Sequence, residues 1–180
     1  MAWEEIESAL ENFLSNQELL RYLGTAEHLV TQRALTYRKH DATVKGVPDL
    51  IAFFKESPPH IFDWKAHHFG TKKYNQQLVV YSIALELAEP HIDFPRSYRK
   101  YQSSDFKISE FQLLTNSLRD YKVEDDFVQD TEQFIADGIY TMLRMGCDLE
   151  FKKLKLSNFR ETYNPDHCTK CPFKKICWSD

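Results

Sequence analysis

The chain has 180 residues, of which 42% are hydrophobic and 28% are charged, so one folded domain with a single core is expected. Only five glycines and seven prolines occur, which argues against a long disordered linker. The formal net charge is −4, so the chain as a whole is not basic and cannot attract nucleic acid through its overall charge. Residues 151–180 are locally basic, with seven basic and three acidic side chains.

No segment has the length and apolar character of a membrane span, since the most apolar stretch, residues 78–88, is short and contains Ser82 and Glu86. The N-terminus is acidic and amphipathic, whereas a secretory signal needs a basic start and an apolar core. A cytoplasmic protein that does not enter a membrane is therefore expected.

The first half of the chain predicts two helices followed by strands. Apolar residues recur at helical spacing over residues 3–14, and a second helix is expected over about 17–37, with a break near Gly24. Residues 43–54 are rich in Val, Ile and Phe and predict two strands joined by a turn. A short strand is predicted over residues 60–66.

The second half of the chain alternates helices with a hairpin. A helix is predicted over residues 73–87, which Pro90 ends, and a hairpin is predicted over residues 108–123. A further helix is expected over residues 125–145, before a cysteine-rich tail. This order predicts an α/β fold with a mixed central sheet flanked by helices.

Two aspartates and a lysine interrupt the apolar strands predicted in the middle of the chain. Asp49 follows Pro48 inside the first apolar segment, and Asp63 and Lys65 lie in the next one. Because alternate residues of a strand face the same side, Asp63 and Lys65 share a face and Trp64 points away. Two strands that lie side by side can then bring Asp49 and Asp63 together.

This arrangement of charges favours a metal site for phosphodiester hydrolysis. Charged side chains on apolar strands are costly unless they are paired or bind a metal. Two adjacent carboxylates suit a hard cation such as Mg²⁺, which can polarise a phosphoryl oxygen, and Lys65 can stabilise the charge that develops there. The alternative is structural, with Asp63 and Lys65 as an ion pair and Asp49 capping the turn after Pro48.

The same residues resemble the motif of the PD-(D/E)XK nuclease superfamily, which here reads Pro48-Asp49 and then Asp63-Trp64-Lys65. That resemblance implies a restriction-endonuclease-like core with a mixed central sheet. It also implies a single nuclease domain over residues 1–180. Its parts would be N-terminal helices over 1–40, a PD-(D/E)XK core over 41–146 and a cysteine-cluster tail over 147–180.

Two further segments are similar to the RecB-like branch of the superfamily. Residues 24–28, Gly-Thr-Ala-Glu-His, are expected on a helix ahead of the core, and residues 77–81, Gln-Leu-Val-Val-Tyr, match a Q-x-x-x-Y signature on the helix after the lysine strand. The resemblance implies Mg²⁺ or Mn²⁺ as cofactor, with Asp49, Asp63 and Lys65 as the catalytic residues. The implied metal ligands are His28, Asp49, Asp63 and the Trp64 backbone carbonyl. The implied DNA contacts are Gln77 and Tyr81, which share a helix face as residues i and i+4.

The function expected from this resemblance is that of a metal-dependent DNA nuclease. An exonuclease that acts on DNA ends or single strands, in repair, recombination or defence, is favoured, with DNA as partner and a helicase as a further protein partner. One alternative is a non-cleaving nucleic-acid-binding or structural subunit of a helicase–nuclease or CRISPR-adaptation complex. Another is an endonuclease with sequence preference.

All four cysteines lie in the last quarter of the chain, at Cys147, Cys168, Cys171 and Cys177. Tetrathiolate sites suit iron–sulfur clusters or zinc. The tail resembles the cysteine tail of iron–sulfur nucleases in the RecB-like branch, which take their first cysteine from upstream of the nuclease motifs, whereas this chain has no cysteine before Cys147. A [4Fe–4S] cluster, a Zn²⁺ site and reduced free thiols therefore remain as alternatives.

Overall fold

The computed structural model describes residues 3–66 and 75–150, and the chain divides into two compact units, residues 1–136 and 137–180. The helices are α1 (Trp3–Ser15), α2 (Gln17–Gly24), α3 (Asn75–Leu87), the short 3₁₀ helix η1 (Ser103–Asp105) and α4 (Asp125–Glu150). The strands are β1 (His28–Thr31), β2 (Leu35–Lys39), β3 (Ala42–Gly46), β4 (Leu50–Phe53), β5 (His60–Lys65), β6 (Lys107–Gln112) and β7 (Ser117–Tyr121).

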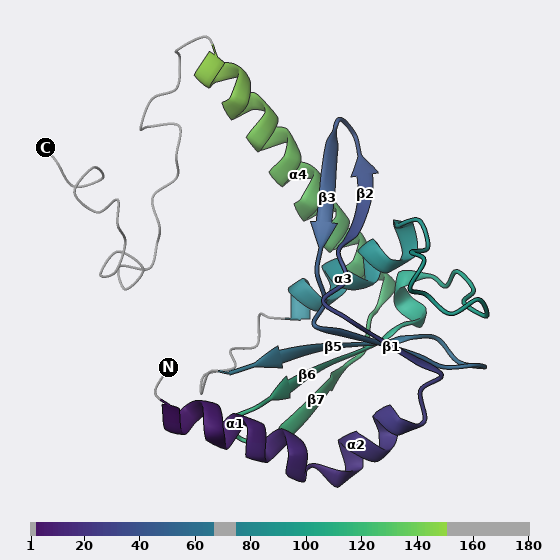
Figure 1. Ribbon diagram of the computed structural model, residues 1–180. Helices are drawn as coiled ribbons and strands as arrows, with labels where there is room; N and C mark the ends of the chain where they lie inside the picture. The colour runs from purple at the N-terminus through teal and green to yellow at the C-terminus, as the bar shows by residue number, and fades with distance from the viewer. Residues whose placement is uncertain (1–2, 67–74, 151–180) are drawn as a thin grey trace, which may run out of the picture. The chain divides into compact units, whose positions relative to one another are not determined.

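A mixed five-stranded sheet of order β1-β4-β5-β6-β7 forms the centre of the first unit (Figure 1). The pair β5–β6 is parallel, and the other neighbouring pairs are antiparallel. A parallel pair needs a crossover connection, and α3 lies in the segment that joins β5 to β6. This sheet confirms the predicted α/β class and is consistent with a restriction-endonuclease-like core.

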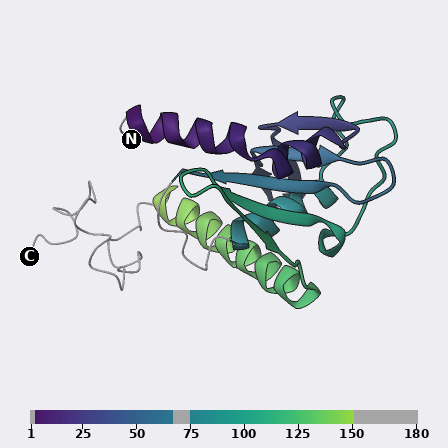
Figure 2. The ribbon, with the colours of Figure 1, turned by 90° about the horizontal axis from the view of Figure 1, so that it is seen from below.

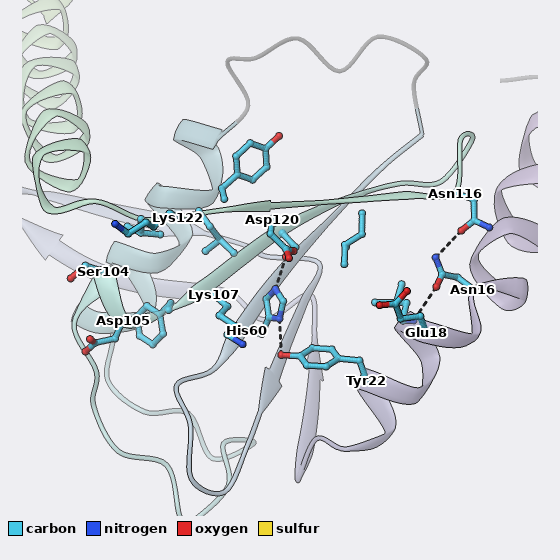
Figure 3. A pocket seen from close by; sticks show the side chains of 17 residues that line it. Asn16, Glu18, Tyr22, His60, Ser104, Asp105, Lys107, Asn116, Asp120 and Lys122 are labelled. Carbon is cyan, nitrogen blue, oxygen red and sulfur yellow. Dashed lines mark hydrogen bonds between the residues drawn. The ribbon is translucent and has the colours of Figure 1, made fainter.

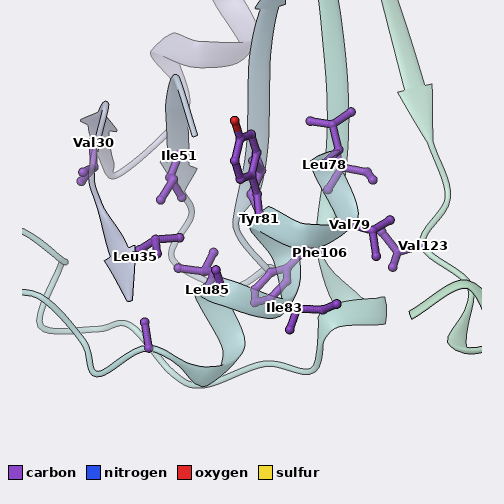
Figure 4. Packing of buried hydrophobic residues seen from close by; sticks show 14 of the residues in the cluster. Val30, Leu35, Ile51, Leu78, Val79, Tyr81, Ile83, Leu85, Phe106 and Val123 are labelled. Carbon is purple, nitrogen blue, oxygen red and sulfur yellow. The ribbon is translucent and has the colours of Figure 1, made fainter. Parts of the chain in front are cut away.

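The two faces of the sheet are covered by different helices because side chains alternate along each strand. On one face Phe62 and Phe111 pack with Leu19 and Leu23 of α2, and α1 lies along the same side (Figures 1 and 2). On the other face the odd-numbered residues of β4 and β5 and the even-numbered ones of β6 pack against α3. Figure 4 shows part of this second core, with Ile51, Leu78, Tyr81 and Leu85. Ile61 and Ile108 belong to the same core.

Strands β2 and β3 form a separate two-stranded hairpin that packs on α3 through Leu35 and Tyr37. A β-carbon added at Gly46, at the end of β3, would lie only 3.1 Å from Cδ1 of Tyr81. Glycine therefore permits a close approach between the hairpin and α3 just before the chain reaches Asp49.

The prediction of a helix over residues 17–37 is wrong beyond Gly24, and residues 1–40 are not helical throughout. Asn16 begins α2, since its side chain accepts a hydrogen bond of 2.9 Å from the Leu19 backbone N–H. After the helix ends, residues 28–31 and 35–39 form strands. The alternating burial of Leu35 and Tyr37 is a strand pattern, which the helical interpretation of the apolar spacing overlooked.

Most other predicted elements lie where the sequence places them, within a few residues. The strands of residues 43–54 do not pair with each other, because β3 pairs with β2 and β4 pairs with β1 and β5. Across the part of the chain that the structure describes, no helix is long and apolar enough to cross a membrane. Cys147 lies on α4 with an exposed side chain, whereas Cys168, Cys171 and Cys177 lie outside the described residues.

Candidate active site

The start of β4 brings Asp49 against the neighbouring strand β5. Asp49 lies immediately before β4 rather than inside it, and its Oδ2 accepts a hydrogen bond of 2.8 Å from the backbone N–H of Trp64. The predicted alternative, that Asp49 caps the turn after Pro48, is therefore replaced by a bond to β5. This bond fixes the first aspartate beside the residues of the D-x-K motif.

A continuous chain of polar contacts joins β5 to α3 at this point. Lys65 forms an ion pair with Asp63, two residues before it on the same face of β5. Its Nζ also donates a hydrogen bond of 2.9 Å to Oε1 of Gln77, and Nε2 of Gln77 donates one of 2.6 Å to the hydroxyl of Tyr81. Because an ammonium group only donates, Lys65 fixes the orientation of the Gln77 amide.

Burial makes the charge of Asp63 costly. The residue is only 3% exposed, and this burial raises the pKa of its carboxyl group. The hydrogen bond and charge of Lys65 lower that pKa, whereas the carboxylates of Asp49 and Glu110 raise it further. A cation beside Asp63 would offset both the cost of burying its charge and the repulsion from Asp49 and Glu110.

Tyr81 remains a neutral phenol at the edge of the site. Its burial is the main cause that raises the pKa of the hydroxyl, and the charges of Asp63 and Asp49 raise it further, while the hydrogen bond from Gln77 lowers it. The contacts through Gln77 and Lys65 connect this side chain of α3 to Asp63.

His28 does not join this group. The residue lies on β1, not on a helix, and its side chain is exposed. In the antiparallel pair β1–β4 it lies opposite Phe53, four residues beyond Asp49, which corresponds to about 13 Å along the strand. The structure therefore brings together Asp49, Asp63, Lys65, Gln77 and Tyr81, but not His28.

A family model for the PD-(D/E)XK nuclease superfamily matches residues 3–178 of this sequence. The chain belongs to the PD-(D/E)XK nuclease superfamily. Membership implies phosphodiester hydrolysis, and nucleases of this superfamily typically use divalent metals such as Mg²⁺ or Mn²⁺.

Two other comparisons add little to the family assignment. A solved structure from Eubacterium rectale, described as a "Putative exonuclease", is similar with a TM-score of 0.49 and 14% sequence identity. The similarity covers 91% of this chain and 62% of that one, so this PD-(D/E)XK chain spans less than two thirds of the protein it matches. No curated protein matches the sequence.

The donor set at this site fits a hard cation that is held by few protein ligands. Within residues 3–66 and 75–150, no group of three or more His, Cys, Asp or Glu side chains is arranged to hold a metal ion. Mg²⁺ is commonly bound through one or two carboxylates, with water and substrate phosphate completing its coordination. Asp49 and Asp63 could supply such a pair, although Asp63 is paired with Lys65 in this structure.

Three residues of this region were not identified from the sequence. Glu110 on β6 lies in register with Asp63, and Arg119 on β7 lies in register with Glu110. Glu110 and Arg119 therefore face the α3 side of the sheet, as Asp63 does. Gln112 donates a hydrogen bond to Glu110. The signal for Glu110 was present, since it is a charged residue between Ile108 and Phe111 in an apolar strand.

A cavity of about 1040 Å³ lies on the opposite face of the sheet and contains none of the predicted catalytic residues. Figure 3 shows His60 on its floor, between Tyr22 and Asp120. Ser109 donates a hydrogen bond of 2.5 Å to Asp120, so its oxygen accepts from Nε2 of His60, at 2.6 Å. Nδ1 of His60 then accepts from the Tyr22 hydroxyl at 2.9 Å, and this chain of bonds is complete without a ligand.

Proposed function

We propose that this protein is a metal-dependent deoxyribonuclease whose centre is formed by Asp49, Asp63 and Lys65. The observation that carries the proposal is the set of contacts from Asp63 through Lys65 and Gln77 to Tyr81, with Asp49 bonded to the adjacent backbone. A structural ion pair alone would not need the glutamine and tyrosine of α3 to converge on it.

Asp49 and Asp63 are the proposed carboxylate ligands of Mg²⁺ or Mn²⁺, and the backbone carbonyl of Trp64 is a further proposed ligand. Both carboxylates lie next to Trp64, because Asp63 precedes it and Asp49 accepts from its N–H. When bound, the cation supplies Lewis-acid stabilisation of a phosphoryl oxygen. His28 is left out of this ligand set because of its distance along β1.

Lys65 is proposed to stabilise the negative charge that grows on the phosphate as water attacks phosphorus. Its ion pair with Asp63 and its hydrogen bond to Gln77 hold the ammonium group at the site before substrate arrives. Such preorganisation avoids the cost of reorienting the charge during the reaction. Gln77 and Tyr81 are proposed to contact the DNA beside the scissile phosphate.

The proposed substrate is a DNA end or a single strand, as in the RecB-like branch whose Q-x-x-x-Y signature matches residues 77–81. A role in repair, recombination or defence, in the cytoplasm and with a helicase as protein partner, is part of the same proposal. The four cysteines are proposed to hold a [4Fe–4S] cluster, with Zn²⁺ as the alternative. A visible absorption spectrum of anaerobically purified protein separates these, because zinc is colourless.

Incubation of the protein with end-labelled single- and double-stranded DNA in Mn²⁺ tests the nuclease proposal. Removal of the charge at Lys65 (Lys65→Ala) should lower cleavage at least 100-fold, because preorganised charge of this kind contributes about that factor or more. Lys122→Ala is the matched control, since this lysine is exposed and forms an ion pair with Glu124.

Undiminished cleavage by Lys65→Ala would contradict the proposed mechanism. A covalently closed circular DNA separates the two modes of cleavage, because an enzyme that needs ends leaves it intact. Binding without turnover in any divalent metal would instead favour a non-cleaving subunit.

A further inference from the structure

Three charged residues form a row across the strands at the catalytic end of the sheet. Asp63 on β5 pairs in register with Glu110 on β6, which pairs in register with Arg119 on β7. Side chains in register on neighbouring strands point to the same face, and the strands lie about 4.8 Å apart. Glu110 therefore adds a third carboxylate beside Asp49 and Asp63, from strand β6, which carries no residue of the motif.

Glu110 is the most deeply buried charged residue of this row. It is 1% exposed, and its Oε1 accepts a hydrogen bond from Gln112 and lies 4.0 Å from Nη1 of Arg119. Its Oε2 is buried and has no hydrogen-bond partner within residues 3–66 and 75–150. A buried carboxylate oxygen without a donor is costly, so the site lacks a positive or hydrogen-bond-donating group at this position.

The neighbouring side chains do not remove this cost. Asp63, the nearest residue on β5, is itself a carboxylate, and Lys65 is already engaged by Asp63 and Gln77. Arg119 is 48% exposed, which weakens its attraction for Glu110 through solvent screening. A hydrated divalent cation between Asp49 and Asp63 would supply both the positive charge and the water O–H donors that are missing.

We propose that Glu110 is a positioning residue of the metal centre, whose charge beside Asp63 strengthens the binding of a divalent cation there. The inference rests on the proposed function, since it assumes that Asp49 and Asp63 hold the cation. Glu110 acts through Asp63 and through water, as residues outside the ligand set do in other metal sites.

Direct titration of the full chain with Mn²⁺, by calorimetry and by the electron paramagnetic resonance signal of unbound Mn²⁺, tests this role without measuring turnover. Glu110→Gln should weaken Mn²⁺ binding about tenfold or more, which is the usual effect of changing a partner just outside the ligands. The amide keeps the acceptor for Gln112 and removes a buried charge, so the variant is expected to fold. Glu132→Gln is the matched control, because this glutamate pairs with Lys39 away from the site.

The outcomes separate this inference from the proposed function. Loss of binding in Asp63→Asn together with weakened binding in Glu110→Gln supports both. Binding that depends on Asp63 but is unchanged in Glu110→Gln overturns only the role of Glu110. Absence of Mn²⁺ binding by the wild type overturns both.

A second variant keeps the inference testable if Glu110→Gln fails to fold. Arg119 is exposed, so Arg119→Gln should fold, and it removes the positive charge that partly offsets Glu110. Tighter Mn²⁺ binding by Arg119→Gln supports the electrostatic role of the row, and unchanged or weaker binding contradicts it.

Discussion

At the scale of single residues, the site around Asp63 depends on a buried negative charge that is paired with a positive one. Asp63 is nearly fully buried, and Lys65 is the cation that makes this burial tolerable. Gln77 links that lysine to Tyr81, which fixes three side chains from two elements in one arrangement. The sequence predicted Asp63 and Lys65 from their charges on an apolar strand, and Gln77 and Tyr81 from the resemblance to a Q-x-x-x-Y signature. The roles of all four residues stay predictions.

Gln77→Leu tests whether this arrangement contributes to catalysis. The change removes the acceptor of Lys65 and the donor to Tyr81, so the ammonium group should lose its fixed position and cleavage should fall about 10- to 100-fold. Gln76→Leu, the same change at the preceding residue of α3, is the control. Equal rates for the two variants would mean that the Gln77 contacts are only structural.

Other residues could not be placed from the sequence because their position depends on strand pairing. The pairing of β5 with β6, across the α3 connection, decides that Glu110 lies next to Asp63. The pairing of β1 with β4 decides that His28 lies opposite Phe53 and not beside Asp49. A shift of one residue in either pair would turn these side chains to the other face.

At the scale of elements, the hairpin β2–β3 and α3 set the position of the proposed catalytic side chains. Gly46 ends β3, three residues before Asp49, and its backbone lies against the ring of Tyr81. The prediction that residues 43–54 hold two strands was confirmed, but their separation into two sheets was not visible in the sequence. That separation depends on long-range packing, which local apolar patterns do not specify.

Gly46→Ala should therefore impair cleavage more than it impairs folding. The added methyl group would lie 3.1 Å from the Tyr81 ring and 3.4 Å from Cβ of Ala84, so the ring must shift by a few tenths of an ångström. A crowded site of this kind typically costs about 1–3 kcal/mol of unfolding free energy. Denaturant titration and cleavage rates together measure the two effects.

Gly24→Ala is the matched control, since no atom lies within 4 Å of a β-carbon added there. It ends α2, where alanine should leave stability unchanged or raise it by up to about 1 kcal/mol. A cleavage rate for Gly46→Ala equal to that of Gly24→Ala would show that the close approach has no catalytic importance.

At the scale of the whole molecule, the sheet separates the face of the proposed catalytic residues from a face on which His60 is buried. His60 lies on the second face, buried beneath α2 and bonded to Tyr22 and Ser109. Burial lowers its pKa from 6.5 to about 4, an effect that Asp120 opposes and Lys107 reinforces. The fold therefore holds this histidine neutral under conditions in which an unfolded chain would protonate it.

The free energy of unfolding should consequently depend on pH through His60. Between pH 6.5 and 4 the unfolded state binds the proton and the folded state does not, so stability is complete above pH 6.5 and falls as the pH drops toward 4. The full loss is about 3 kcal/mol. Urea titrations across this range should show a steeper loss for the wild type than for His60→Gln, and parallel curves would contradict the burial of a neutral histidine.

The fold class follows from the alternation of strands and helices, whereas the position of each strand in the sheet does not. The helix predicted over about residues 17–37 continues in the structure only to Gly24, and strands cover residues 28–31 and 35–39. Short apolar segments of this kind do not separate helix from strand by periodicity alone. Family membership was confirmed by the match over residues 3–178, and the cysteine cluster stays a prediction.

The central claim is that Asp49 and Asp63 hold one divalent cation beside Lys65. Anomalous diffraction at the manganese absorption edge, from crystals of the protein soaked in Mn²⁺, locates such an ion directly. A manganese peak is expected within coordination distance of both carboxylates, on the α3 face of the sheet. A peak bound elsewhere, or an Asp63 carboxylate that stays paired to Lys65 with no ion between it and Asp49, would contradict this proposal.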